Sequence, residues 1–177
     1  MREEIYKYLS TVDRDNINVL FNQLEKWGFF VAPCSTSHHL NKLGGLAEHS
    51  INVLRYALDI ASVMQLPNVD SVVLTALLHD VGKCNDYYVD NVLTNGNIST
   101  KKPFKVNDEL VIKDHALRGV LMVSPYIQLT EEEQTAILYH MGFYDNSSRD
   151  YWRNPSPLAM CLHYADMMAT KFEMGEL

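Results

Sequence analysis

The sequence predicts an all-α fold, a helical bundle with a small β-hairpin inserted between helices. Apolar residues recur at helical spacing along most of the chain, and residues that start or stop helices flank these segments. Asn95-Gly96, a dipeptide typical of two-residue hairpin turns, separates two apolar runs. We expect one domain over residues 1–177, with an N-terminal helix in 1–30 and a core over about 31–172.

The N-terminal part contains two helical patterns separated by a loop. Residues 17–27 carry apolar side chains at helical spacing, and Gly28 ends this helix. Residues 31–43 have a mixed polar composition and are expected to form the loop. The next helix begins at Gly44-Gly45 and continues to about residue 60, and its apolar face includes His49.

A third helix follows the turn at Pro67-Asn68 and is expected to end near Gly82. His79 and Asp80 would then lie in its last turn, at the end of a buried apolar run. The hairpin is expected over residues 87–106.

Three more helices complete the predicted bundle. The first carries His115 and stops before Pro125. The second opens with the capping box at 130–133, carries His140 and closes at Gly142. The last begins at Ser156-Pro157 and continues to about Phe172.

The composition limits the function classes. The net charge of −7 and the lack of a lysine or arginine run argue against sequence-independent binding to duplex nucleic acid, which depends on neutralising phosphates. No apolar run approaches the roughly 20 residues needed to cross a membrane, and no signal peptide is visible. The three cysteines are far apart, as is typical of reduced thiols, so we expect a cytoplasmic protein.

Histidine and aspartate residues spread over five successive predicted helices indicate a metal site. They lie near apolar faces or helix ends, where a carboxylate is costly unless it is paired or bound to a metal. Mixed nitrogen and oxygen ligands suit divalent ions such as Mn, Fe, Co, Ni, Zn or Mg. The predicted ligands are His49, His79, Asp80, His115, His140 and Asp166.

This order of residues resembles the HD-domain superfamily of metal-dependent phosphohydrolases, in particular small bacterial and phage-type members. The matching motifs are Gly44-Gly45-Leu46-Ala47-Glu48-His49, His79-Asp80-Val81-Gly82-Lys83 and Leu162-His163-Tyr164-Ala165-Asp166. The resemblance implies an HD-domain helical bundle that holds two metal ions. One ion would be bound by His49, His79, Asp80 and Asp166, and Asp80 would bridge to a second ion bound by His115 and His140.

The positions of several residues near the predicted ligands indicate roles in catalysis and binding. Asp80 and Lys83 are the expected catalytic residues, with Lys83 neutralising charge on the phosphoryl oxygens; a solvated lysine at a helix C-terminus is the alternative interpretation. His39, Lys42 and Lys83 are the expected substrate-binding residues, because His39 and Lys42 precede a helix start whose N–H groups favour anions. The hairpin with Tyr87 and Tyr88 could cap the pocket and stack on a base; the alternative interpretation is that these rings fill a satellite core.

The expected function is a metal-dependent phosphohydrolase that cleaves a phosphomonoester or phosphodiester. Its expected partner is a small phosphorylated substrate such as a nucleotide, with no duplex nucleic acid and no membrane. Two alternatives stay open: a mixed-valent di-iron oxygenase, which would use the same ligand set, and a metal-stabilised binding module without catalysis. The oxygenase would need iron and oxygen, whereas the hydrolase would work without oxygen.

Overall fold

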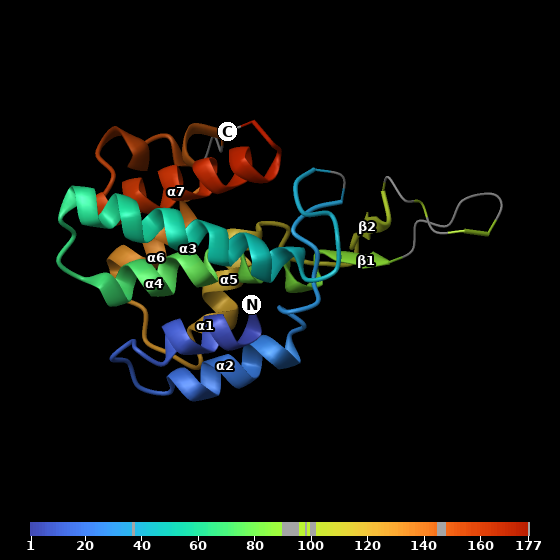
Figure 1. The fold of residues 1–177 in the computed structure, drawn as a ribbon, viewed down its shortest axis with the longest axis horizontal. Coiled ribbons are helices and arrows are strands. Elements are labelled where there is room, and N and C mark those ends of the chain that lie inside the picture. The colour runs from blue at the N-terminus through green and yellow to red at the C-terminus, as the bar shows by residue number, and fades with distance from the viewer. Residues whose placement is uncertain (37, 90–95, 98, 100–101, 145–147, 177) are drawn as a thin grey trace.

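The computed structural model describes residues 1–36, 38–89, 96–97, 99, 102–144 and 148–176. Helices dominate these residues, and a two-stranded sheet lies to one side of the helical body (Figure 1). The elements are α1 (Arg2–Leu9), α2 (Ile17–Lys26), α3 (Gly45–Met64), α4 (Val69–Leu78), β1 (Tyr87–Val89), β2 (Phe104–Val106), α5 (His115–Val123), α6 (Glu131–Leu138) and α7 (Pro157–Glu173). The predicted all-α bundle with a small hairpin is confirmed.

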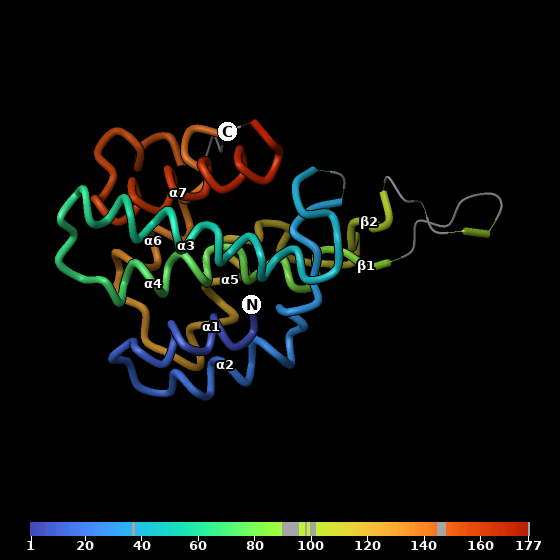
Figure 2. Tube along the Cα trace, viewed as in Figure 1, coloured from blue at the N-terminus to red at the C-terminus, as the bar shows by residue number. Residues whose placement is uncertain are grey.

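The N-terminal region contains two helices, α1 and α2, where a single helix within 1–30 was expected. Residues 10–16 between them form turns, and Asn16 has the left-handed φ of 63° directly before α2. Ile5 and Leu9 of α1 are buried, and α1 packs against both α2 and α4. The two helices therefore form one flank of the bundle, as the tube in Figure 2 shows.

Helix α3 is the centre of the bundle, because it packs against both α7 and α4. Its apolar residues are buried as the sequence predicts, and His49 is buried among them. Helix α4 is buried along nearly its whole length, from Ser71 to Leu78. The same three helices thus supply most of the hydrophobic core and hold His49 inside it.

The α4 helix ends at Leu78, four residues before the expected end near Gly82. A 3₁₀ helix, Val81–Asn85, follows at once, so His79 and Asp80 lie at the junction of the two helices. A Cβ atom on Gly82 would lie 2.0 Å from the carbonyl oxygen of His115. This close approach of the two backbones requires glycine and brings the start of α5 next to Asp80.

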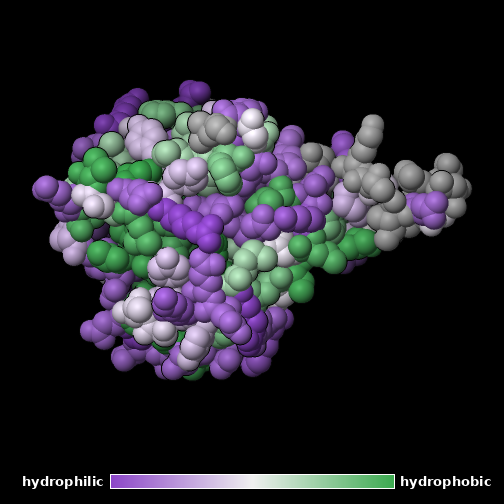
Figure 3. All heavy atoms as spheres, viewed as in Figure 1, coloured by the Kyte–Doolittle hydropathy of each residue, from purple (hydrophilic) through white to green (hydrophobic). Residues whose placement is uncertain are grey.

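The hairpin strands pair antiparallel, with Tyr88 opposite Lys105 at the centre of the register. Asn95, the first residue of the predicted turn, lies outside the described residues. On the face shown in Figure 3, hydrophobic residues gather beside β1 and β2, where Val89 and Val106 are exposed. Among the described residues, no helix has both the length and the apolar character required to span a membrane.

Two predicted helix starts are confirmed in α6 and α7. Thr130 and Glu133 form the capping box of α6, and the Ser156 side chain caps α7 with Pro157 in its first turn. Helix α6 ends at Leu138, so His140 lies in the turn after the helix, where a position on the helix was expected. Gly142, with a φ of 63°, reverses the chain after this turn.

Candidate metal centre

The Asp80 carboxylate lies at the centre of the predicted ligand set and is 1% exposed. Its Oδ2 atom lies 3.4 Å from Nε2 of His79 and 3.8 Å from Nε2 of His49. Its Oδ1 atom lies 3.2 Å from Nε2 of His115 and 3.6 Å from Nε2 of His140. Each carboxylate oxygen therefore faces a different pair of histidines.

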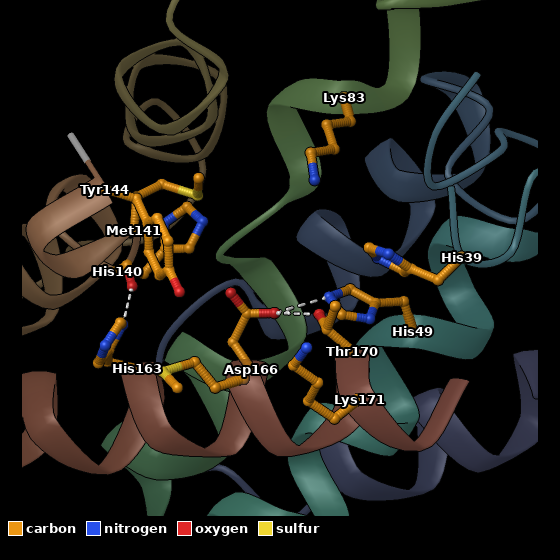
Figure 4. A pocket seen from close by; sticks show the side chains of 11 residues that line it. His39, His49, Lys83, His140, Met141, Tyr144, His163, Asp166, Thr170 and Lys171 are labelled. Atoms are coloured by element: carbon orange, nitrogen blue, oxygen red, sulfur yellow. Dashed lines mark hydrogen bonds and ion pairs between the residues drawn. The ribbon is translucent and has the colours of Figure 1, made fainter. Parts of the chain in front are cut away.

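Asp166 approaches the same cluster from α7. Its Oδ1 atom lies 3.1 Å from Nε2 of His49 and accepts a hydrogen bond from Thr170 at 3.4 Å (Figure 4). The structure thus brings all six predicted ligand residues together, from α3, the end of α4, the start of α5, the turn after α6, and α7. Long-range packing of these helices, rather than neighbouring sequence, builds the cluster.

Backbone and side-chain acceptors orient the histidine rings. Nδ1 of His79 donates to the carbonyl oxygen of Ala76 at 2.9 Å, and Nδ1 of His140 donates to that of Ile137 at 2.7 Å. A neutral ring with hydrogen on Nδ1 keeps the lone pair of Nε2 free. Both rings therefore direct a metal-binding lone pair toward Asp80.

Three buried polar atoms of the cluster have no hydrogen-bond partner among the described residues: Nε2 of His79, Oδ1 of Asp80 and Nε2 of His115. Unpaired polar atoms are costly inside a protein, and native structures contain few of them. Each of the three residues belongs to a group of His and Asp side chains whose ligand atoms lie within 4.8 Å of one another, and their donor types are those that divalent transition ions prefer. The residues present therefore fit a bound cation.

The electrostatic environment favours the metal-binding form of His140 and Asp80. Burial and the neighbouring His79 ring lower the pKa of His140 to about 3, so His140 is neutral at neutral pH. Burial alone would raise the pKa of the Asp80 carboxyl, but Lys83 and His79 hold it well below its usual range. Neutral imidazole and ionised carboxylate are the forms that bind metals.

Lys83 lies against this carboxylate. Its Nζ atom donates to Oδ2 of Asp80 at 2.6 Å, and its side chain is 16% exposed. Burial alone would lower the pKa of Lys83, but Asp80 raises it above its ordinary value, so the ammonium group stays charged. Lys83 also lines the cavity described below, and its role in catalysis stays a prediction.

A cavity of about 300 Å³ opens beside the cluster. His39 lines it, is 15% exposed, and contacts Sγ of Cys34 at 3.3 Å. Lys42 does not line it: its side chain is 57% exposed and pairs with Glu48 at 2.8 Å. Of the two expected phosphate-binding residues in this loop, the structure brings only His39 to the cavity.

Other described residues at the centre were not predicted from the sequence. Glu173 accepts a hydrogen bond from Nδ1 of His49 at 2.9 Å, and its side chain is 2% exposed. Nδ1 of His163 donates to the carbonyl oxygen of His140 at 2.7 Å. Glu173 follows Asp166 by two helical turns, a spacing that places both on one face of α7 and that could have indicated it.

The cavity also has an apolar side that was not predicted from the sequence. Met141, Tyr144 and Met167 line it, whereas Tyr87 and Tyr88, the residues expected to stack on a base, do not. Tyr88 instead lines a separate hollow with Asn107, Asp108 and Glu109. The hairpin strands therefore do not cap the cavity in this structure.

Comparisons with known proteins identify relatives of the chain. Residues 46–171 match the HD domain family. The 3′-5′ exoribonuclease YhaM of Bacillus licheniformis is 25% identical over 98% of this chain and 54% of its own length. The YhaM proteins of Listeria welshimeri and Bacillus pumilus are 24% and 27% identical, over 55% and 54% of their lengths. The chain spans about half the length of these relatives, and no solved structure matches it.

These relatives correct the expected partner. A small phosphorylated compound was expected, but the relatives are named as exoribonucleases, whose substrate is RNA. The net charge of −7 argues only against binding to duplex nucleic acid, in which a protein neutralises many phosphates at once, and it does not exclude an RNA chain end. An enzyme that acts at a chain end needs to contact few of them.

Family and relatives together support a metal-dependent hydrolase of phosphoester bonds. Because the matched region covers the greater part of the sequence and contains all the predicted ligands, the chain belongs to the HD-domain family of metal-dependent phosphohydrolases.

Proposed function

We propose that this protein hydrolyses phosphodiester bonds at the 3′ end of RNA, with two divalent metal ions held by the six predicted ligands. The observation that carries the proposal is the geometry of Asp80, whose two oxygens face two separate pairs of histidines. A carboxylate in this position is suited to bridging two ions. The named activity of the relatives supports RNA as the substrate.

In this proposal, His49, His79, Asp80 and Asp166 would hold one ion, and Asp80, His115 and His140 would hold the other. Bound ions of this kind polarise a phosphoryl oxygen and lower the pKa of a water molecule toward neutrality. Mn, Fe, Co, Ni, Zn and Mg are all compatible with the ligand types.

The side chains of this protein would bind and orient the substrate. Lys83 keeps its charge at the cavity and is the residue placed to neutralise a phosphoryl oxygen. His39 lies on the cavity beside His49 and is a second group for phosphate contact. The Asp80 and Asp166 carboxylates are themselves negative, so the bound ions and Lys83 would balance the negative charge of the scissile phosphate.

The test is a reaction of the full chain with a 5′-labelled RNA oligonucleotide and each of several divalent ions, with and without oxygen. Stepwise shortening from the 3′ end without oxygen is the expected result. Asp80→Asn should abolish it, whereas Asp59→Asn, an exposed carboxylate on α3, should not.

Three outcomes would contradict the proposal. Activity that requires iron and oxygen would favour the oxygenase alternative. Metal binding without turnover of any RNA would favour the binding module. Full activity of Asp80→Asn would exclude the proposed centre.

A further inference from the structure

The apolar side of the cavity faces the proposed metal ligands. Figure 4 shows Met141 and Tyr144 on the side of the cavity opposite His39 and His49, with Asp166 between the two sides. Tyr144 is 81% exposed and Met141 is 38% exposed. Together with Met167, which lines the same cavity, these residues form what we call the apolar wall.

Two residues of the apolar wall are sequence neighbours of predicted metal ligands. Met141 directly follows His140, and Met167 directly follows Asp166. A part of the substrate that contacts the apolar wall is therefore adjacent to the part that is bound at the metal ligands. Such a surface does not favour binding of a phosphate alone, because apolar side chains offer the phosphate no hydrogen bond.

Surrounding contacts fix the turn that carries the apolar wall. His163 donates to the carbonyl oxygen of His140 at 2.7 Å, and Nε1 of Trp152 donates to that of Tyr139 at 2.9 Å. A Cβ atom on Gly142 would lie 2.3 Å from the His163 ring, so the ring packs directly on the glycine backbone. The turn is thus pre-organised, which lowers the entropic cost of binding.

We propose that the apolar wall is the stacking surface for the base of the 3′-terminal nucleotide. This inference rests on the proposed function and names the part of the substrate that the cavity receives. Any of the four bases can stack on an aromatic ring, and methionine side chains adapt to bases of different shape. The apolar wall therefore binds the terminal base with little regard to its identity.

The size of the cavity supports an unpaired terminal nucleotide. Its volume of about 300 Å³ is at the lower end of the range for small-molecule sites. A single nucleotide matches that range, whereas a paired terminus would need room for a second base beside the first. Lys83 and Lys171 line the same cavity and supply positive charge for the phosphates.

The test compares two 5′-labelled oligoadenylates, one ending in a normal nucleotide and one ending in an abasic residue, by kcat/KM of the first cleavage. The wild-type protein should prefer the normal end by about five-fold or more. Tyr144→Ala should remove this preference, and Tyr144→Phe, which keeps the ring, should retain it. Phe143→Ala is the matched control, because Phe143 is an exposed neighbour, 62% accessible, that does not line the cavity.

The outcomes separate this inference from the proposed function. If the wild-type protein shortens both RNAs at equal rates, or if Tyr144→Ala keeps the preference, RNA hydrolysis stands and the stacking surface is excluded. If the wild-type protein shortens neither RNA, the proposed function fails, and the stacking inference fails with it. Thermal unfolding of Tyr144→Ala should match the wild type, since the residue is exposed.

Discussion

Glu173 and Asp166 hold the two ring nitrogens of His49 from a single helix. Glu173 accepts a hydrogen bond from Nδ1 at 2.9 Å, and Asp166 lies 3.1 Å from Nε2. Asn52 donates to the same Glu173 carboxylate at 2.9 Å and fixes it in turn. A carboxylate behind a histidine ligand sets its tautomer and strengthens it as a metal ligand.

Glu173→Gln should therefore weaken metal binding by about 10–100-fold while leaving the fold intact. The neutral amide accepts a weaker hydrogen bond from His49 than the carboxylate does. Metal titration followed by calorimetry measures the effect. Glu176→Gln, an exposed glutamate on the same end of the chain, is the control; equal affinity in both variants would contradict the orienting role.

Lys83→Met should lower kcat for RNA hydrolysis by about 10²–10³-fold, because a charged donor would be lost from the transition state. Metal content should stay at the wild-type level, since Lys83 is not one of the six ligands. Lys42→Met removes an exposed lysine outside the cavity and should leave kcat unchanged. A Lys83→Met variant that turns over normally would remove Lys83 from the mechanism.

Removing metal with a chelator should lower the melting temperature. At a free metal concentration 100 times the Kd, bound metal stabilises a protein by about 2.7 kcal/mol. For a chain of this length, that corresponds to a change of roughly 5–10 °C. Differential scanning calorimetry of wild type and Asp80→Asn provides the measurement, and the variant should show no comparable dependence on metal.

Glu133 provides a pH-dependent stability contribution away from the metal centre. Its buried carboxylate accepts hydrogen bonds from Arg14 and Ser71, each at 2.7 Å. Burial alone would raise the pKa of Glu133, but these contacts and the Thr130 backbone lower it below 4.5. The resulting stabilisation is present above pH 4.5 and is lost as the pH falls through the lowered folded-state pKa.

Glu133→Gln should accordingly cost about 3 kcal/mol at pH 7, because Arg14 loses its buried partner. The difference from wild type should shrink as the pH is lowered below 4.5. Urea unfolding at several pH values checks both statements. Glu131→Gln changes an exposed glutamate in the same helical turn and should stay within about 0.5 kcal/mol of wild type.

Gly82→Ala should cost about 3 kcal/mol or more and displace His115, because its Cβ atom would lie 2.0 Å from a backbone oxygen. Gly119→Ala should cost less, since its nearest contacts lie at 3.2 Å and alanine favours the helical conformation there. Unfolding in urea and the metal-to-protein ratio are the measurements. Equal costs for the two substitutions would show that the close approach at Gly82 is not the cause.

The sequence predicts the helices. It also indicates the six ligand residues, because each lies beside a helical apolar pattern. It misplaces the ends of two helices, since the junction at Asp80 depends on a backbone contact between Gly82 and His115 that lies outside any local pattern. Glu173 was missed because it follows polar and exposed residues, and only the packing of α7 on α3 buries it.

Lys42 lies outside the cavity, although its place in the sequence favours contact with phosphate. Its place just before a helix start favours contact with an anion, but Glu48 in the first turn of that helix competes for its charge. Tyr144 could not be singled out either, because its position depends on the turn at Gly142 and the His163 ring packed against it. In both cases the deciding partner is set by the tertiary fold.

Helix α7 has a consequence for the order in which a newly made chain becomes competent. It supplies Asp166 and the carboxylate that holds His49, and it is the last helix of the structure in chain order. A ribosome-bound chain that has emerged only as far as the turn after α6 carries the four histidine ligands but lacks both of these groups. The set of metal ligands in the nascent protein is therefore incomplete until α7 has left the ribosome and packed against α3.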